Sequence, residues 1–440
     1  KSKPRPRLYQ LSSLGPGKTG IRKPDLVSPS SDVVSPKSFG KASSNRQCSM
    51  GCLDKWTGSS MATPAVSGLI ALASQYIKQT FGFKPSGTLL RALLINTATN
   101  PIDGTTNPRN DVGYGVPNLY TALGMDGSDV IFLNRLEFKT TNHLAATIKI
   151  ASSFPFSCTL CFLDKPSKTF LAPLFDDLDM ILESPDGQVF FGNGGDRECQ
   201  FSTNERVFIE HPKEGQWTIH ILHSGLSADV PFSLAMRGSF ESKAVEFHSE
   251  HQCITNGKGK CVGGLWKCPR GFVGQLCHLE SPQLDVNITQ NVTTTPYQVT
   301  YLYHKLAFNR ISDIRLRIHQ MNVHPVVRVC MRSSDFPGSL VEEGWECQGR
   351  EESEMEFIFG SSKIESDTLF IALYTIYDRK VPLSLELAYH EVTELLSKSS
   401  MHSRIGVLFA GAIFLFLCLL MVSFVKLTRK SAHVEDEEVL

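Results

Sequence analysis

The stretch TGSSMATPAVSG, residues 57–68, decides the fold because three hydroxyl residues lie just ahead of a run of small apolar residues. Gly58 permits a tight backbone approach, and the residues after it predict a helix of small side chains suited to deep burial. Pro64 is tolerated in the first turn of a helix, so the helix is expected to begin near Ser60. Ser60 is therefore expected where free N–H groups and the positive end of the helix dipole favour a developing negative charge.

Three ordered segments of the sequence resemble subtilisin-like serine proteases. Residues 57–68 are similar to the family's serine signature, Gly-Thr-Ser-Met-Ala-x-Pro, with the nucleophile at Ser60 and Ser59 in place of the usual threonine. SSLGPGKTGIRKPDLVSP (12–29) is similar to the segment upstream of that serine, and GYGVPNLYTAL (113–123) resembles the closing Gly-x-Gly…Asn…Ala-Leu helix. Taken alone, Ser60 also fits a core helix with an N-cap serine, and the two flanking segments favour the nucleophile.

The resemblance implies a fold and a chemistry for the N-terminal region. Residues 1–125 are expected to be the C-terminal part of an α/β subtilisin-like catalytic domain, in which Ser60 attacks the scissile carbonyl. The backbone N–H of Ser60 is expected to supply one oxyanion donor.

The other members of the family's catalytic triad are not found in this sequence. The triad runs Asp, His, Ser in chain order, and no histidine precedes His143. One interpretation is that the chain is part of a longer precursor, with the aspartate, the histidine and the oxyanion asparagine upstream. The other is an inactive relative, because a subtilisin-type serine without its base loses on the order of a million-fold in turnover. The resemblance assigns no role to His143 and the later histidines, because they lie beyond the end of the catalytic domain, and most of them are expected to be solvated strand or loop residues.

Composition restricts the class of protein. The 440 residues imply several domains, and 44 basic against 44 acidic residues give no reason to expect a nucleic-acid partner. Twelve cysteines, clustered at short spacings, favour an oxidising compartment. The pair Cys158 and Cys161 forms C-x-x-C, but without a second ligand pair or a βαβ context it predicts neither a zinc site nor a redox site.

Residues 405–425 predict a single transmembrane helix, because the run IGVLFAGAIFLFLCLLMVSFV contains no charge and would span about 31 Å. One basic residue precedes it and three follow closely, so the tail, residues 426–440, is expected in the cytosol. Everything upstream is then extracellular or lumenal, at the plasma membrane or a secretory-pathway or endolysosomal membrane. The sequons at Asn287 and Asn291 agree with this orientation as glycosylation sites.

Residues 126–245 predict an antiparallel β domain and resemble the jelly-roll or P-domain-like β-sandwich that follows the catalytic domain in large subtilases. Two interpretations remain open for its acidic run: either the carboxylates contribute ligands to a structural calcium, or they line a solvated strand edge. The three residues of this run are Asp176, Asp177 and Asp179. The expected strands are 145–151, 178–182, 206–210, 216–222 and 231–237.

Residues 250–280 resemble an EGF-like module reduced to four cysteines. The resemblance of its closing loop implies a Cys268–Cys277 disulfide, with Cys253–Cys261 as the second pair. Residues 281–395 predict a second β-rich domain, in which Cys330 and Cys347 are expected to pair. Its expected strands are 298–303, 313–319, 326–331, 368–377 and 383–390.

The sequence as a whole predicts a membrane-anchored serine endopeptidase of the subtilisin-like family, hydrolysing protein or peptide substrates through an acyl-enzyme on Ser60. Ser-Met-Ala-Thr-Pro favours the broad subtilisin branch over the kexin-like convertases. No metal ligand or cofactor is assigned beyond the calcium interpretation. The alternative is a catalytically inactive adhesion or receptor protein on a relict subtilase fold, with its EGF-like and β domains as the working parts.

Overall fold

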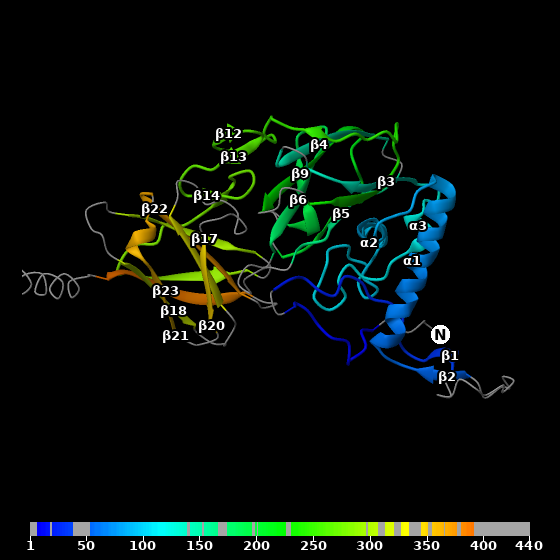
Figure 1. The fold of residues 1–440 in the computed structure, drawn as a ribbon, viewed down its shortest axis with the longest axis horizontal. Helices are drawn as coiled ribbons and strands as arrows, with labels where there is room; N and C mark the ends of the chain where they lie inside the picture. Colours follow the sequence, from blue (N-terminus) through cyan, green and yellow to red (C-terminus); the bar gives the residue numbers. More distant parts are fainter. Residues whose placement is uncertain are drawn as a thin grey trace, which may run out of the picture.

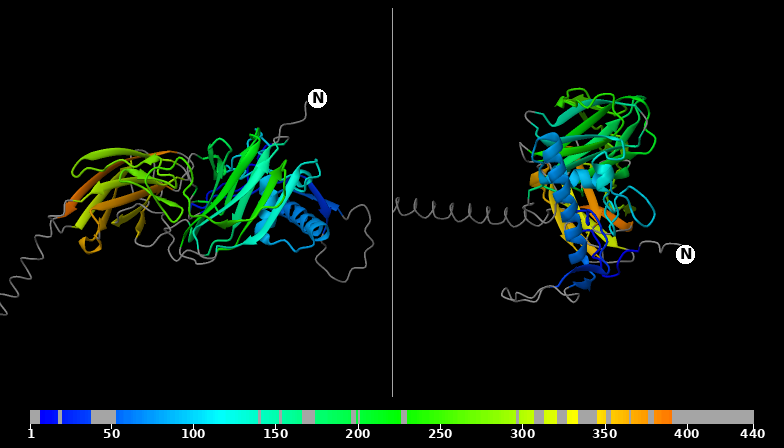
Figure 2. Two further views of the ribbon diagram at one scale, coloured as in Figure 1. Left: turned by 90° about the horizontal axis from the view of Figure 1, so that it is seen from above. Right: turned by 90° about the vertical axis from the view of Figure 1, so that its right-hand side faces the viewer.

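The chain forms two β-rich lobes joined by a small cysteine-rich module, with the helices on the outer side of one lobe (Figures 1 and 2). This computed structural model describes residues 7–17, 20–37, 53–138, 141–151, 154–165, 174–195, 199, 201–225, 230–295, 298–306, 313–320, 327–333, 345–350, 354–364, 366–375 and 380–390.

The N-terminal region contains a short hairpin followed by three helices. Its elements are β1 (Val33–Pro36), β2 (Leu53–Trp56), α1 (Ser59–Phe81), α2 (Gly87–Asn96) and α3 (Leu119–Ala122). Helix α1 ends at Gly82, whose positive φ of 77° favours glycine. Helix α2 begins after Ser86, whose hydroxyl accepts a hydrogen bond from the Leu89 amide.

Helix α1 differs from its prediction in burial and in the place of its proline. Only Ala73 and Ile77 of its 23 residues are buried, and Leu72 is 56% exposed. The helix contacts the rest of the described chain along one narrow stripe, which is why the expected deep burial is wrong. It begins at Ser59, so Ser60 is near the N-terminus as predicted, while Pro64 lies in the second turn instead of the first.

Two packed sheets form the first lobe. One sheet has the order β3-β10-β5-β8 and the other β11-β4-β9-β6-β7, and the side chains between them form one large apolar core. The strands are β3 (Asp129–Leu136), β4 (His143–Ile150), β5 (Phe156–Phe162), β6 (Asp176–Glu183), β7 (Val189–Phe191), β8 (Asn204–Ile209), β9 (Gly215–Gly225), β10 (Phe232–Gly238) and β11 (His248–Ser249), with a 3-10 turn, η1, at Gly192–Gly194.

Each of the five strands expected in this lobe overlaps an observed strand, at β4, β6, β8, β9 and β10. Strand β5 carries both cysteines of the C-x-x-C pair on opposite faces, as a spacing of three on a strand requires. Cys158 lies in the core between the sheets, whereas Cys161 lies on the outer face with α2. Both thiols are free and buried.

Strand β6 contradicts the solvated-edge interpretation of the acidic run. Asp176, Asp177 and Asp179 are each 1% exposed, so they line no solvated edge. Asp176 lies on the opposite face of the strand from Asp177 and Asp179: it is 3.4 Å from His223 Nε2, whereas Asp179 accepts a hydrogen bond from Gln275. The described residues contain no group of three acidic, histidine or cysteine side chains placed to hold a metal ion. The strand is buried because it lies between β9 and β7 and is covered by the next module.

The cysteine-rich module follows β11 and consists of two small hairpins. Disulfides join Cys253 to Cys261 and Cys268 to Cys277, with Cα–Cα distances of 5.9 and 5.1 Å. Such a short segment has little core, so these crosslinks supply much of its stability. Its strands are β12 (Lys260–Val262), β13 (Leu265–Lys267), β14 (Phe272–Val273) and β15 (Leu279–Glu280).

The second lobe is another pair of four-stranded antiparallel sheets, with orders β16-β23-β18-β21 and β17-β22-β19-β20. Cys330 and Cys347 face one another on β19 and β20 and are disulfide-bonded. The strands are β16 (Thr289–Thr294), β17 (Thr300–Lys305), β18 (Asp313–Gln320), β19 (Val327–Ser333), β20 (Glu346–Arg350), β21 (Glu354–Phe359), β22 (Thr368–Thr375) and β23 (Val381–His390), with a 3-10 turn, η2, at Ser361–Lys363.

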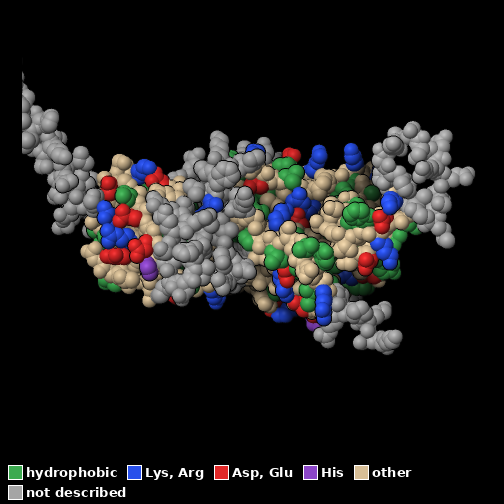
Figure 3. Space-filling model, turned by 90° about the horizontal axis from the view of Figure 1, so that it is seen from below, with side chains coloured by type: hydrophobic (Ala, Val, Ile, Leu, Met, Phe, Trp, Pro, Cys, Tyr) green, Lys and Arg blue, Asp and Glu red, His purple; other side chains and the backbone are tan. Residues whose placement is uncertain are grey.

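The second lobe carries a cluster of charged side chains on one face. Figure 3 shows acidic and basic side chains gathered on the second lobe, where Arg317 of β18 pairs with Glu356 and Glu386 of the neighbouring strands.

Among the described residues no helix is both long enough and apolar enough to cross a membrane. The predicted span, residues 405–425, and the predicted tail, residues 426–440, lie outside the described residues.

Candidate active site

The turn before α1 holds Ser60 at a defined position. The hairpin β1–β2 pairs Val33 with Trp56, which delivers the chain to Thr57 and Gly58. The Gly58 amide donates to the Ser30 carbonyl at 3.0 Å, and the Thr57 hydroxyl accepts from the Asp32 amide at 3.0 Å. Gly58 has a φ of 151°, a conformation that residues with a Cβ rarely adopt. The glycine of the serine signature is therefore required by the turn itself.

Ser60 is presented to solvent at the positive end of a long helix. Its side chain is exposed, and within the described chain its hydroxyl and its amide make no hydrogen bond. The free amide points out of the first helical turn, where partial positive charge accumulates. Pro64 has no N–H to donate to the Ser60 carbonyl, so this residue also lacks its usual intrahelical partner. An exposed hydroxyl beside a free N–H is the arrangement that an acyl-transfer nucleophile needs.

The two segments that flank the serine signature in sequence meet in space. The Tyr114 amide donates to the Asp25 carbonyl at 2.9 Å, and the Val27 amide donates to the Gly115 carbonyl at 3.0 Å. A Cβ on Gly115 would lie 2.0 Å from the Thr99 carbonyl oxygen, so the close approach excludes any larger residue. The described residues of 12–29 and 113–123 therefore form one packed unit that supports the segment preceding the serine.

Helix α2 attaches this unit to the first β lobe through buried polar contacts. Arg206 of β8 is 3% exposed and donates from Nη1 to the carbonyls of Ile95 at 2.6 Å and Ala98 at 2.7 Å, which caps the C-terminal end of α2. The Asn96 side chain accepts hydrogen bonds from Ser157 and Thr159 of β5. Because the guanidinium is buried among carbonyls, desolvation lowers its pKa to about 10.

Sequence reasoning missed these junction residues. Arg206 lies in the run NERVFIE, which we interpreted as a simple strand, and a strand pattern does not say which face meets a helix end. Its one sequence signal is a charged residue directly before the apolar residues Val207, Phe208 and Ile209. This signal indicates a buried partner only when the packing is known.

The described residues place no general base beside Ser60. The first histidine, His143, starts β4 on the far side of the first lobe's sheets and is fully buried. His220, His223 and His304 are also buried, each 5% exposed, so these four are exceptions to the expectation that most histidines are solvated. They are buried because each finds a hydrogen-bonding or ionic partner inside a β lobe.

The two sequon asparagines lie on exposed backbone of the second lobe. Asn287 is in a turn before β16 with a positive φ of 58°. Asn291 is an exposed residue of β16, an edge strand, and its side chain accepts a hydrogen bond from Ser384 at 2.7 Å. Both side chains are accessible to a modifying enzyme in this structure.

The sequence comparisons place the subtilase resemblance in the same region. Residues 2–115 match the sequence profile described as the subtilase family. The Dictyostelium discoideum protein named serine protease/ABC transporter B family protein tagA is 26% identical over 225 residues, which are 45% of this chain and 13% of that protein. Its relative tagD is 35% identical over 135 residues, which are 24% of this chain and 7% of that protein. The chain thus spans a small fraction of the curated relatives it matches.

Comparison with solved structures adds little. A crystal structure of tripeptidyl peptidase 2 is 13% identical, with a TM-score of 0.28 over 75% of this chain and 26% of that one. The CUB1-EGF-CUB2 region of human MASP-1/3 gives 12% identity and a TM-score of 0.16 over 59% of this chain and 99% of that one. At these scores neither structure supports an inference about the fold. The sequence profile and the relatives carry the assignment, and they show that the N-terminal part of this chain is subtilase-like.

Proposed function

We propose that the chain is the serine-bearing part of a subtilisin-like serine endopeptidase, with Ser60 as the nucleophile that forms the acyl-enzyme. The observation that carries this proposal is the turn at Gly58, which presents an exposed Ser60 hydroxyl beside a free amide at the N-terminus of α1. The amide would stabilise the oxyanion that forms when the hydroxyl attacks a peptide carbonyl.

The base that removes the proton from Ser60 comes, in this proposal, from a complementary part of the catalytic domain that packs against α1. The support is the unusual exposure of that helix: Leu72 is 56% exposed and Phe81 43%, and Trp56 of the adjacent β2 is 58% exposed. Apolar side chains on a helix that carries the nucleophile favour a covering partner. A histidine and an aspartate on that partner would complete the triad.

The test is covalent labelling of the serine with a fluorophosphonate probe. Full-length precursor that includes the complementary part should label at Ser60, because only an activated serine reacts quickly. Ser60→Ala should abolish the adduct, while the neighbouring Ser59→Ala is the matched control and should label normally. The 440-residue chain alone should label negligibly.

Labelling that persists in Ser60→Ala would overturn the assignment of the nucleophile. A precursor that contains both triad partners and still fails to label would favour the inactive adhesion or receptor protein instead.

We also propose that the protein is anchored as a single-pass type I membrane protein with a glycosylated ectodomain. The supports are the uncharged run 405–425, the basic residues that follow it and the exposure of both sequons. Microsomal protein should lose mass with an N-glycosidase, and Asn287→Gln and Asn291→Gln should each remove one glycan. Unmodified sequons together with a protected tail would contradict this orientation.

A further inference from the structure

Two buried histidines and a glutamate form a polar chain where the first β lobe meets the cysteine-rich module. His143 Nε2 lies 3.0 Å from His220 Nδ1, and His220 Nε2 lies 3.4 Å from Glu183 Oε2. His143 and His220 are 0% and 5% exposed. The three residues come from the adjacent strands β4, β9 and β6 of one sheet.

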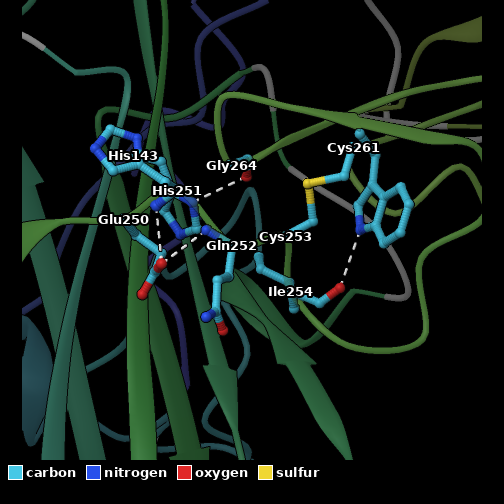
Figure 4. Close-up of a disulfide and its surroundings, with 9 residues drawn as sticks. His143, Glu250, His251, Gln252, Cys253, Ile254, Cys261 and Gly264 are labelled. Carbon is cyan, nitrogen blue, oxygen red and sulfur yellow. Dashed lines mark hydrogen bonds between the residues drawn. A yellow bond between two sulfur atoms is a disulfide. The ribbon is translucent and has the colours of Figure 1, made fainter.

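Both ends of this polar chain of side chains contact the cysteine-rich module. His143 Nδ1 lies 3.0 Å from the Gly264 carbonyl oxygen in the β12–β13 turn, as Figure 4 shows, and Glu183 accepts a hydrogen bond from the Thr255 hydroxyl. A Cβ at Gly264 would lie 3.0 Å from His143 Nδ1 and 2.5 Å from the Glu250 carbonyl oxygen, so the turn is packed tightly on the lobe.

The hydrogen positions of the His143–His220 pair limit how many protons it can bind. The Gly264 carbonyl only accepts, so His143 Nδ1 carries a hydrogen and the neutral ring leaves Nε2 as an acceptor. His220 then donates from Nδ1, and its Nε2 faces the Glu183 carboxylate. One added proton fits on His220 Nε2, where it forms a N–H toward Glu183.

A second proton does not fit. It would have to bind His143 Nε2, and two N–H groups of two cationic rings would then face each other across 3.0 Å. The backbones of β4 and β9 are paired in register at this point, with Ala145 opposite His220, so the rings and not the strands must move. Rotation of the His143 ring breaks its contact with Gly264.

We propose that His143, His220 and Glu183 form a pH-sensitive latch that holds the β12–β13 turn of the cysteine-rich module on the first β lobe and releases it when a second proton enters. This inference is independent of the protease proposal, because none of these residues belongs to the Ser60 turn.

The groups around the latch act on the pKa of His143 in opposite directions, and those that lower it prevail, although the hydrogen bond to the Gly264 carbonyl raises it. Burial, and then the charge of His220, lower the pKa of His143 to about 4. Glu250 raises that pKa from the β11 side and His248 lowers it, and these two side chains lie 3.8 Å apart. The hydrogen bond from His220 lowers the pKa of Glu183, which keeps the carboxylate ionised.

The sign of the pH effect follows from these shifts. A freed His143 binds a proton below about pH 6.5, whereas the latched residue resists protonation until about pH 4. The latched state is therefore fully favoured above pH 6.5 and loses its advantage as the pH falls toward 4. Acid releases the turn and neutral pH restores it.

Hydrogen exchange measured by mass spectrometry on the full chain tests the latch. Between about pH 7 and about pH 4.5, after correction for intrinsic rates, amides of β12 and β13 should lose at least about tenfold in protection. Peptides from β5 and β18 in the two lobes should lose several-fold less protection than β12 and β13 over the same range.

Two substitutions assign the effect to the pair. His143→Asn keeps a donor for the Gly264 carbonyl and removes the titrating ring, so the acid step at β12–β13 should disappear. His211→Asn, which changes an exposed histidine of the same lobe, should keep the step.

An acid step that survives in folded His143→Asn would overturn the proposal. If that variant does not fold, the wild-type protein still tests the proposal. Equal losses of protection in β5 and in β12–β13 at the same pH would indicate general acid unfolding and would exclude a latch.

Discussion

The first β lobe and the N-terminal subtilase-like region differ in how their apolar side chains are used. The lobe buries a continuous core between two sheets, with Phe232 and Leu234 at 0% exposure. The longest helix of the N-terminal region buries only Ala73 and Ile77. The lobe is thus complete by itself, whereas the helix that carries Ser60 has a face that nothing in the described chain covers.

This difference shows where stability and chemistry reside. Helix α2 packs on the outer face of the sheet β3-β10-β5-β8 and shares a cluster with Ala235, so the N-terminal region is held to the lobe at that side. Helix α1 lies farther out (Figure 1), and Ser60 is in its first turn. Rigid packing on one side and an open helix on the other suit a site that is completed by another part of a catalytic domain.

The largest difference between the two regions is expected when a leucine is replaced by alanine in each of them. Leu234→Ala in β10 should lower the free energy of unfolding of the first lobe by about 2–5 kcal/mol, because it leaves a cavity in a closed core. Leu72→Ala on α1 should change it by less than about 0.5 kcal/mol, because that side chain is already solvated. Urea unfolding read out by hydrogen exchange of β9 measures both. Equal losses would mean that α1 is packed in solution and that the contrast does not hold.

A smaller effect is expected at the junction of the two regions. Arg206→Met keeps the apolar stem but leaves the carbonyls of Ile95 and Ala98 without their buried donor, at a cost of about 2–3 kcal/mol. Arg109→Met is the control, because its ion pairs with Asp103 and Asp111 are exposed and contribute less than about 1 kcal/mol. Urea midpoints give both values, and a neutral Arg206→Met would show that α2 does not depend on the lobe.

The helix N-termini sharpen the contrast further. Ser86→Ala should cost about 1 kcal/mol, because the Ser86 hydroxyl caps α2 by accepting from the Leu89 amide. Ser59→Ala should lower the free energy of unfolding by at most about 0.3 kcal/mol, since α1 begins after Gly58 with no side-chain cap. Thermal unfolding compares the two variants. A larger loss for Ser59→Ala would indicate a capping role that the structure does not show.

The smallest effect is a pH dependence confined to the β lobes. Burial lowers the pKa of His223, so the native lobe keeps this ring neutral while the unfolded chain binds a proton below about pH 6.5. Stability is complete above that value and falls as the pH drops toward the native pKa. Residues 7–125 contain no histidine and should show no such slope. Hydrogen exchange of α2 and β9 at several pH values compares them, and replacing His223 by Gln should flatten the curve for β9.

The sequence by itself determined the local elements and the subtilase-like motifs. Alternating apolar residues predicted β4, β6, β8, β9 and β10, because side chains on a strand alternate between faces and an antiparallel lobe needs that period. The segments around residues 15 and 113 were identified by their resemblance to the family's motifs, and the structure shows that backbone lies too close for a Cβ on Gly15 or Gly113. The structure joins the pairs 253–261, 268–277 and 330–347, and the first two are the pairs that the resemblance to an EGF-like module implied.

Only the tertiary structure decided which polar residues are buried and what the helix of Ser60 contacts. The carboxylates of β6, the four buried histidines and Arg206 look like surface residues in sequence, because burial of a charged or polar group depends on partners far along the chain. His143 and His220 are 77 residues apart, and Arg206 lies 111 residues from Ile95. The exposure of α1 had no sequence signal either. Small apolar residues on a helix indicate that its surface can pack against another element, but they do not identify that element.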